Sequence, residues 1–157
     1  MKTLTKSSIL GLLVSTVFYL VSCGGGGGSA VTPTGSGTFT FDPVTKVISG
    51  SITVMNIANT TAAHIHDGNV GVDGPVVVGL VESPPATWSV PANTILTDAQ
   101  IARLQAGGYY VNVHTTQNPN GEIRGQLTAS STNPNVFNAT LSTSQEVANP
   151  IVQMGGY

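Results

Sequence analysis

The chain has 157 residues, of which 8% are charged and 19 are glycine. This length favours a single domain. After residue 23, three basic residues stand against seven acidic ones, a net charge of −4 with neutral histidines. No basic patch interleaved with aromatic residues is present, which argues against nucleic acid as a partner. Cys23 is the only cysteine, so the domain cannot contain an internal disulfide and must be stabilised by packing.

Residues 1–22 have the pattern of an export signal. Two lysines precede the apolar run Ile9–Leu20, which is too short for a membrane-spanning helix. The following Leu20-Val21-Ser22-Cys23 resembles a bacterial lipobox. The resemblance implies cleavage before Cys23 and attachment of acyl chains, palmitate among them, which would anchor the protein stably in a membrane. We therefore expect a lipoprotein of the bacterial cell envelope, at the outer membrane; simple secretion with a free Cys23 is the alternative.

Residues 23–34 are expected to form a flexible linker, because five consecutive glycines begin at Gly24. Residues 35–157 are expected to form the domain. Alternating apolar and polar residues, or short apolar runs, predict strands. The predicted strands cover residues 38–41, 47–55, 62–66, 76–80, 109–115, 122–127 and 136–141. Residues 68–75 are predicted to be a glycine-rich loop, and three prolines predict another loop around Trp88. The large aromatic side chains are expected in the core.

One short helix is predicted between the strands. Thr97-Asp98-Ala99-Gln100 has the pattern of a capping box, and Gly107-Gly108 provides a C-terminal stop. Ile101 and Leu104 give this helix an apolar stripe. Many short strands with turn signals predict an all-β antiparallel sandwich or barrel, with this helix packed on it.

Three motifs are similar to those of the CHRD (chordin-type) domain family. They are Ala63-His64-Ile65-His66-Asp67-Gly68, Gly74-Pro75-Val76-Val77, and Tyr110–Thr115 followed by Pro119–Leu127. The resemblance covers Gly35 to Leu127. It implies an immunoglobulin-like sandwich or barrel with a weak likeness to copper–zinc superoxide dismutases, and it implies no particular reaction.

The order of one motif differs from the family pattern. CHRD domains usually open with a strand resembling F-x-A-x-L-S-x-x-Q-E-V-P-P. Here that pattern comes last, within residues 136–150, as Phe137-Asn138-Ala139-Thr140-Leu141-Ser142 and the residues that follow. A circular permutation would explain this, because a domain without the strand would expose a sheet edge. Donation of the strand to a neighbouring molecule, giving a swapped dimer, and a truncated second repeat are the alternatives.

All three histidines of the chain lie in these motifs. His64 and His66 share one face of a strand, and His114 shares a face with Tyr110 and Asn112 on another. If the strands are neighbours, three imidazoles with an open coordination position could bind copper or zinc. The H-x-H step also resembles the copper-binding part of superoxide dismutases. The preferred interpretation is a hydrogen-bonded polar cluster oriented by Asp67, Asn112, Thr115 or Glu122.

Several polar residues have weaker signals. Glu122 and Arg124 are expected to share a face and either brace the hairpin or hold a carboxylate ligand. Glu146 could pair with Arg124 if the last strand packs here. Asp67, Asn69 and Asp73 offer oxygen ligands for calcium, but their spacing lacks the EF-hand pattern, so solvated turn residues are preferred.

The sequence therefore favours a non-enzymatic, envelope-anchored lipoprotein that acts as a binding, adhesion or structural module. Its expected partners are the membrane, through the lipid, and an envelope or extracellular protein; a monomer and a strand-swapped dimer are both open. The alternative is a copper- or zinc-binding protein with a redox or metal-handling role. Imidazole nitrogens within about 4 Å of one point would favour the metal interpretation, because metal–nitrogen bonds are near 2 Å.

Overall fold

A computed structural model describes residues 31–147, and strands dominate this part of the chain. The elements follow one another as β1 (Thr34–Phe41), β2 (Ile48–Met55), β3 (Thr60–Asp67), β4 (Val76–Gly79), β5 (Val81–Ser83), β6 (Thr87–Ser89), α1 (Asp98–Gln105), β7 (Tyr109–Thr115), β8 (Ile123–Gln126), β9 (Thr128–Ala129), β10 (Val136–Ser142) and the 3₁₀ turn η1 (Thr143–Gln145). The expected export signal, Cys23, and most of the glycine linker lie outside the described residues, as does 148–157. Among residues 31–147, no helix has the length and apolar composition needed to cross a membrane.

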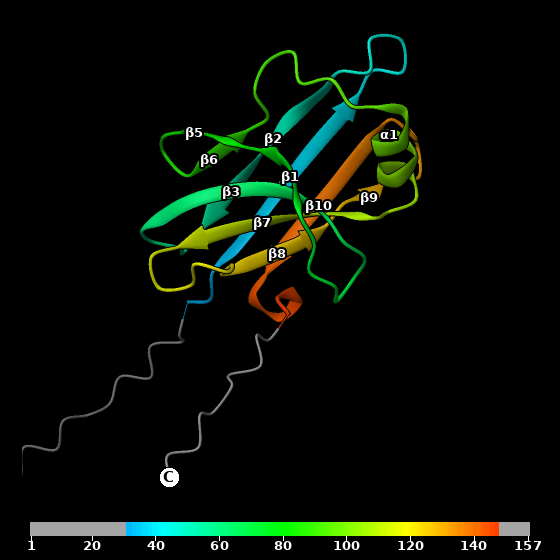
Figure 1. Cartoon of the computed structure of the whole chain (residues 1–157). Helices are drawn as coiled ribbons and strands as arrows, with labels where there is room; N and C mark the ends of the chain where they lie inside the picture. The colour runs from blue at the N-terminus through cyan, green and yellow to red at the C-terminus, as the bar shows by residue number, and fades with distance from the viewer. Residues whose placement is uncertain (1–30, 148–157) are drawn as a thin grey trace, which may run out of the picture.

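The strands form one antiparallel sheet that curls into a nearly closed barrel. Its order is β4-β3-β7-β8-β10-β1-β2-β6-β5, with β9 pairing to β10. The two ends of this order are consecutive in the chain, since only Leu80 separates β4 from β5. Figure 1 shows β3, β7 and β8 crossing in front of β1, β2 and β10. The predicted all-β sandwich or barrel is therefore confirmed.

The core lies between these two layers and follows from the alternation of the strands. Inward residues of β1, β2 and β10 are buried while their neighbours are exposed. On the opposite layer, Ala63, Ile65, Val111 and Val113 are completely buried. Because inward and outward residues alternate, the opposite faces of β3 and β7 point away from the core.

The C-terminal strand is central in the sheet. β10 pairs antiparallel with β1 over its whole length, with Phe39 opposite Phe137, and it contacts β8 on its other side, with Ser142 opposite Arg124. In Figure 1, β10 (orange) runs beside β1 (blue). The residues that resemble the family's opening strand thus complete the sheet of their own chain. The last part of that motif, from residue 148, lies outside the described residues.

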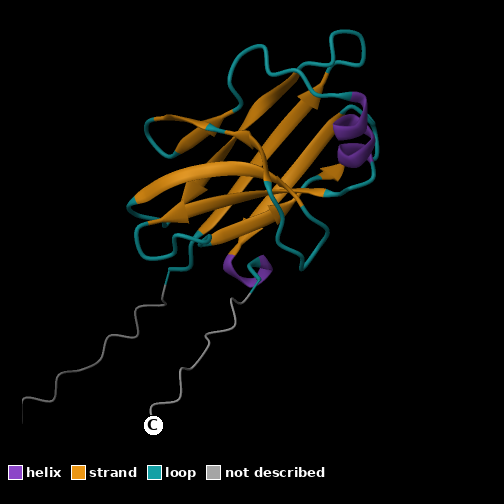
Figure 2. Ribbon diagram, viewed as in Figure 1, coloured by secondary structure: helices purple, strands orange, loops and turns teal. Residues whose placement is uncertain are grey.

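The helix has the predicted caps. The Thr97 side chain accepts from the Gln100 N–H, and the Gln100 side chain accepts from the Thr97 N–H, which completes the capping box. At the other end, Gly107 N–H donates to Leu104 and Gly108 N–H donates to Arg103. This is a Schellman ending, and Gly107 has the positive φ of 71° that it requires. Figure 2 shows α1 at one end of the strands and η1 at the other.

The predicted loop around Trp88 is partly wrong. This segment contains β5 and β6, which pair with each other, and β6 pairs with β2. Trp88 lies opposite Ile52 and is 5% exposed, so it is a core residue as expected. The prolines that favoured a loop flank β6 instead of interrupting it, because each can occupy a turn without losing a ladder hydrogen bond.

Candidate metal centre

The pairing of β3 with β7 brings the three histidines together. In this register Ala62 lies opposite His114, and His64 lies opposite Asn112. His66 follows two residues after His64 on the same face. All three imidazoles therefore project from the outer face of the barrel, opposite the buried Ala63 and Ile65.

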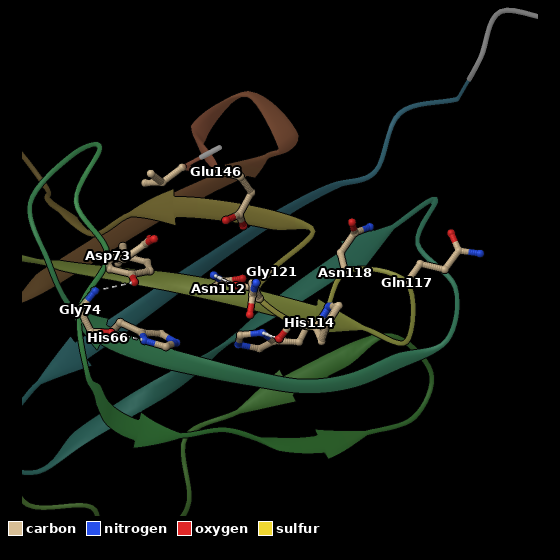
Figure 3. A pocket seen from close by; sticks show the side chains of 13 residues that line it. His66, Asp73, Gly74, Asn112, His114, Gln117, Asn118, Gly121 and Glu146 are labelled. Atoms are coloured by element: carbon tan, nitrogen blue, oxygen red, sulfur yellow. Dashed lines mark hydrogen bonds between the residues drawn. The ribbon is translucent and has the colours of Figure 1, made fainter. Parts of the chain in front are cut away.

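The ring nitrogens are close enough for one small ion to contact all three. One nitrogen from each of His64, His66 and His114 lies within 4.8 Å of the other two. His64 Nδ1 and His114 Nε2 are 3.0 Å apart. Figure 3 shows the rings of His66 and His114 pointing toward one another. The three imidazoles therefore form one cluster, in which His64 and His114 are also within hydrogen-bond distance of each other.

Backbone carbonyls orient two of the rings. His66 Nδ1 is 2.9 Å from the Gly74 carbonyl oxygen, and His114 Nδ1 is 2.9 Å from that of Pro119. A carbonyl oxygen only accepts, so Nδ1 of each ring carries the proton and donates. His66 Nε2 is then an acceptor without a partner in the described part of the chain, whereas His114 Nε2 lies within hydrogen-bond distance of His64 Nδ1. The arrangement of His66, with one nitrogen bonded to the protein and the other available, is typical of metal-ligating histidines.

His66 Nε2 has no hydrogen-bond partner in the described part of the chain, although it is buried. Burial is also the main cause that lowers the pKa of His66, and the charge of His114 contributes. The pKa of His64 is lowered as well, by burial first and then by the charges of His114 and His66. These rings therefore stay neutral at pH 7, which is the form that binds metal ions.

A CHRD domain family model matches residues 25–127. This chain belongs to the CHRD domain family. Comparisons with curated proteins and with solved structures found no match. The assignment confirms the resemblance seen in the sequence and indicates a binding or structural module. The match ends at Leu127, before β10.

The Gly74 carbonyl of this CHRD domain is held in place by close backbone contact. Asp67 N–H donates to the Pro75 carbonyl at 2.9 Å, and Gly74 N–H donates to the Tyr110 hydroxyl at 3.2 Å. A Cβ atom at position 74 would overlap the Asp67 backbone carbonyl. Only glycine fits here, because the 68–75 loop approaches β3 so closely.

The Arg124 side chain holds the loop of residues 68–75 in place. It does not pair with Glu122, although the sequence had suggested this pair. Its side chain is 1% exposed and donates to the carbonyls of Asn69 and Val72 at 2.8 and 2.9 Å. It also forms a 3.3 Å ion pair with Asp73. The guanidinium carbon lies 3.3 Å from the centre of the Tyr110 ring. His66 stacks on Tyr110 as well, with centroids 4.9 Å apart and ring planes 8° apart.

The side chains that were expected to orient the imidazoles have other partners. Asp67 pairs with Arg103 at 2.7 Å, and the Asn112 amide donates to the Asn120 carbonyl at 3.2 Å. Glu122 accepts from the Thr115 hydroxyl at 2.6 Å. Within residues 31–147, none of these side chains forms a hydrogen bond with a histidine ring. They brace strands and turns, so the predicted orientation of the rings by side chains is wrong.

Two carboxylates at the glycine-rich loop are paired with arginines, Asp67 at the end of β3 with Arg103 and Asp73 within the loop with Arg124. The residues that sequence reasoning missed are the carbonyls of Gly74 and Pro119. Both lie in motifs that resemble the family, but a carbonyl's direction depends on loop conformation and leaves no signal in residue type.

Proposed function

We propose that this CHRD domain binds one divalent transition-metal ion through His64, His66 and His114. The observation that carries the proposal is the buried His66 Nε2, which lacks a partner in the described chain and faces the other two imidazoles. Leaving a buried acceptor unpaired costs about 1–3 kcal/mol. Coordination would remove that cost.

The required adjustment of the rings is small. Three nitrogens about 2 Å from a tetrahedral ion are separated by about 3.3 Å. The observed upper limit of 4.8 Å and the shortest separation of 3.0 Å bracket this value. Rotations about the histidine side-chain bonds can bring all three nitrogens to it.

Copper is favoured over zinc. Neutral imidazole suits both ions, but a nitrogen site of given geometry binds Cu²⁺ more tightly than Zn²⁺. Three protein ligands leave a coordination position open. The domain would accordingly act in metal binding or handling, and the proposal includes no reaction.

The proposal also places the domain in the bacterial envelope. The export pattern of residues 1–22 and the lipobox-like end at Cys23 support lipid anchoring there, at the outer membrane. Replacement of Cys23 by serine is expected to release the protein from the membrane fraction. If the Cys23→Ser protein stays with the membranes after a high-salt wash, another segment anchors it.

Circular permutation is part of the proposal for how the domain is built. It is supported by the F-N-A-T-L-S pattern of β10, by its pairing with β1, and by the end of the family match before β10. In a permuted domain, the strand that opens the family sequence would lie near the C-terminal end of the chain. It would still pair with β1, as β10 does here.

The metal proposal is tested by titrating the full-length purified chain with Cu²⁺ and with Zn²⁺ in a calorimeter. We expect one Cu²⁺ per chain, with electron paramagnetic resonance showing nitrogen ligands. Removal of an outer-shell partner commonly costs 10–100-fold in affinity, so loss of a ligand in His66→Ala should cost at least about 100-fold.

The matched control is Gln117→Ala. Gln117 lines a cleft together with His66 and His114, but its side chain is exposed. It should bind copper like the wild type. Circular dichroism confirms that each variant is folded. A folded His66→Ala protein with unchanged copper stoichiometry and affinity would remove the proposal.

A further inference from the structure

We propose that the cleft beside the three histidines binds a small ligand whose neutral N–H or O–H group donates a hydrogen bond to Asn112 and Glu146. This inference rests on the proposed function, because another atom of the same ligand would fill the open coordination position of the metal. The ligand class is thus a metal-coordinating molecule with an N–H or O–H group.

The cleft has the size of a small-molecule site. Its volume is about 700 Å³, within the range of about 300–1,000 Å³ that is usual for ligand pockets. Two of the histidines, His66 and His114, line it together with Asn112 and Glu146. In the view of Figure 3, Asn112 lies between Glu146 and the histidine rings. A ligand in the cleft would therefore lie among these four side chains.

Asn112 lies at the centre of this face of the sheet. It is opposite His64 on β3 and opposite Arg124 on β8. The side chain is 2% exposed, and its amide nitrogen donates to the Asn120 carbonyl at 3.2 Å. That bond fixes the orientation of the amide. The buried Oδ1 has no partner in the described part of the chain, so the cleft contains an acceptor that lacks a donor.

Glu146 supplies a second acceptor from the C-terminal segment. Its Oε1 is buried and has no hydrogen-bond partner among residues 31–147. The preceding Gln145 holds the segment in place, since its amide donates to the Thr140 carbonyl at 2.7 Å and accepts from Gln126 N–H at 3.3 Å. Burial raises the pKa of Glu146 to about 7 against the opposing charge of Arg124.

The part of the ligand that points away from the metal would meet acidic side chains. Asp73 and Glu146 both line it. Arg124 lies behind them, but its nitrogens donate to two carbonyls and to Asp73, and its face is covered by Tyr110. Three of the five N–H donors of Arg124 are used in this way, whereas two buried acceptors lack a donor in the described part of the chain. A neutral donor satisfies them without adding negative charge.

Imidazole and 1-methylimidazole are suitable probes. Both coordinate copper through one ring nitrogen, but only imidazole carries an N–H on the other. The copper affinity of the full-length chain is measured first. Each probe is then titrated at saturating copper, and the visible absorbance and paramagnetic resonance of the metal report binding. We expect imidazole to bind about 10-fold more tightly, the equivalent of about 1.4 kcal/mol, a typical hydrogen bond.

The variant Glu146→Ala separates a hydrogen bond from simple exclusion of the methyl group. It should weaken imidazole about 5- to 10-fold and leave 1-methylimidazole unweakened. The control Glu82→Ala, in the exposed strand β5, should retain the full preference for imidazole.

The two proposals fail in different ways. If copper binds but wild-type protein does not distinguish the two probes, or Glu146→Ala binds imidazole as well as wild type, the ligand inference is overturned and the metal site stands. If copper does not bind through the histidines, both proposals are wrong.

Discussion

Phe137 provides a direct measure of how much β10 contributes to the fold. Its side chain is completely buried, opposite Phe39 on β1 and Ala129 on β9. Phe137→Ala removes a buried aromatic ring and leaves a cavity, which typically costs about 3–5 kcal/mol. For a domain of this size, such a loss should lower the melting temperature by about 10–20 °C.

The matched control is Thr140→Ala on the same strand. Thr140 is exposed, and its backbone carbonyl, which accepts from Gln145, is retained. We expect a change within about 0.5 kcal/mol. Thermal and urea unfolding, followed by circular dichroism, measure both variants. Equal melting temperatures for the two would show that β10 is not an integral part of the core.

Truncation after residue 135 extends the same test to the whole strand. The shortened chain loses the neighbour that β1 and β8 share, which exposes a sheet edge. It should not unfold cooperatively. A truncated protein with a cooperative transition at the wild-type temperature would refute both the packing argument and the permutation.

The remaining predictions concern the site. The pKa of Glu146 is raised by burial from 4.5 to about 7, so folding favours its protonated form, and wild-type stability is lost as pH rises through that value. Glu146→Gln should therefore match wild type at pH 4 and exceed it by about 1–2 kcal/mol at pH 8, a figure reduced for partial exposure; equal stability at both pH values would contradict this. Gly74→Ala should lower copper affinity about 10- to 100-fold by displacing the carbonyl that orients His66. The control is Gly71→Ala, which has open space at its Cβ; it should cost only about 1 kcal/mol of stability and leave copper affinity unchanged. Because the pKa values of His64 and His66 are lowered from 6.5, both rings of the metal-free protein should titrate below pH 6.5 in a nuclear magnetic resonance pH series, and a transition of either ring above that pH would argue against its burial.

Much of the fold could be predicted because its signals are local. Alternation on a strand depends only on the period of two, so β1, β3, β7 and β10 were recognisable from a few residues each. The helix caps are equally local, since Thr97 and Gln100 satisfy each other within four residues. Strands β5, β6 and β9 were missed because they are two or three residues long. Pairing with neighbouring strands stabilises them, and their residue types give little indication of it.

For the site as well, some features follow from the local sequence and others only from strand pairing. The sequence by itself determined that His64 and His66 share a face and that His114 lies on a similar face of another strand. It also supplied the family motifs. Only the tertiary structure decided that β3 and β7 are neighbours in the register that brings the rings together, because pairing between distant segments is set by packing of the whole barrel.

Tertiary structure also decided which atoms of these residues are available. The carbonyls of Gly74 and Pro119 fix the protonated nitrogen of two rings, and loop contacts give Arg124 and Glu122 separate partners although they are two residues apart. These outcomes depend on the direction of individual backbone groups and on burial. Neither is encoded in residue type or spacing, so the sequence could name the histidines but not the backbone groups that orient their rings.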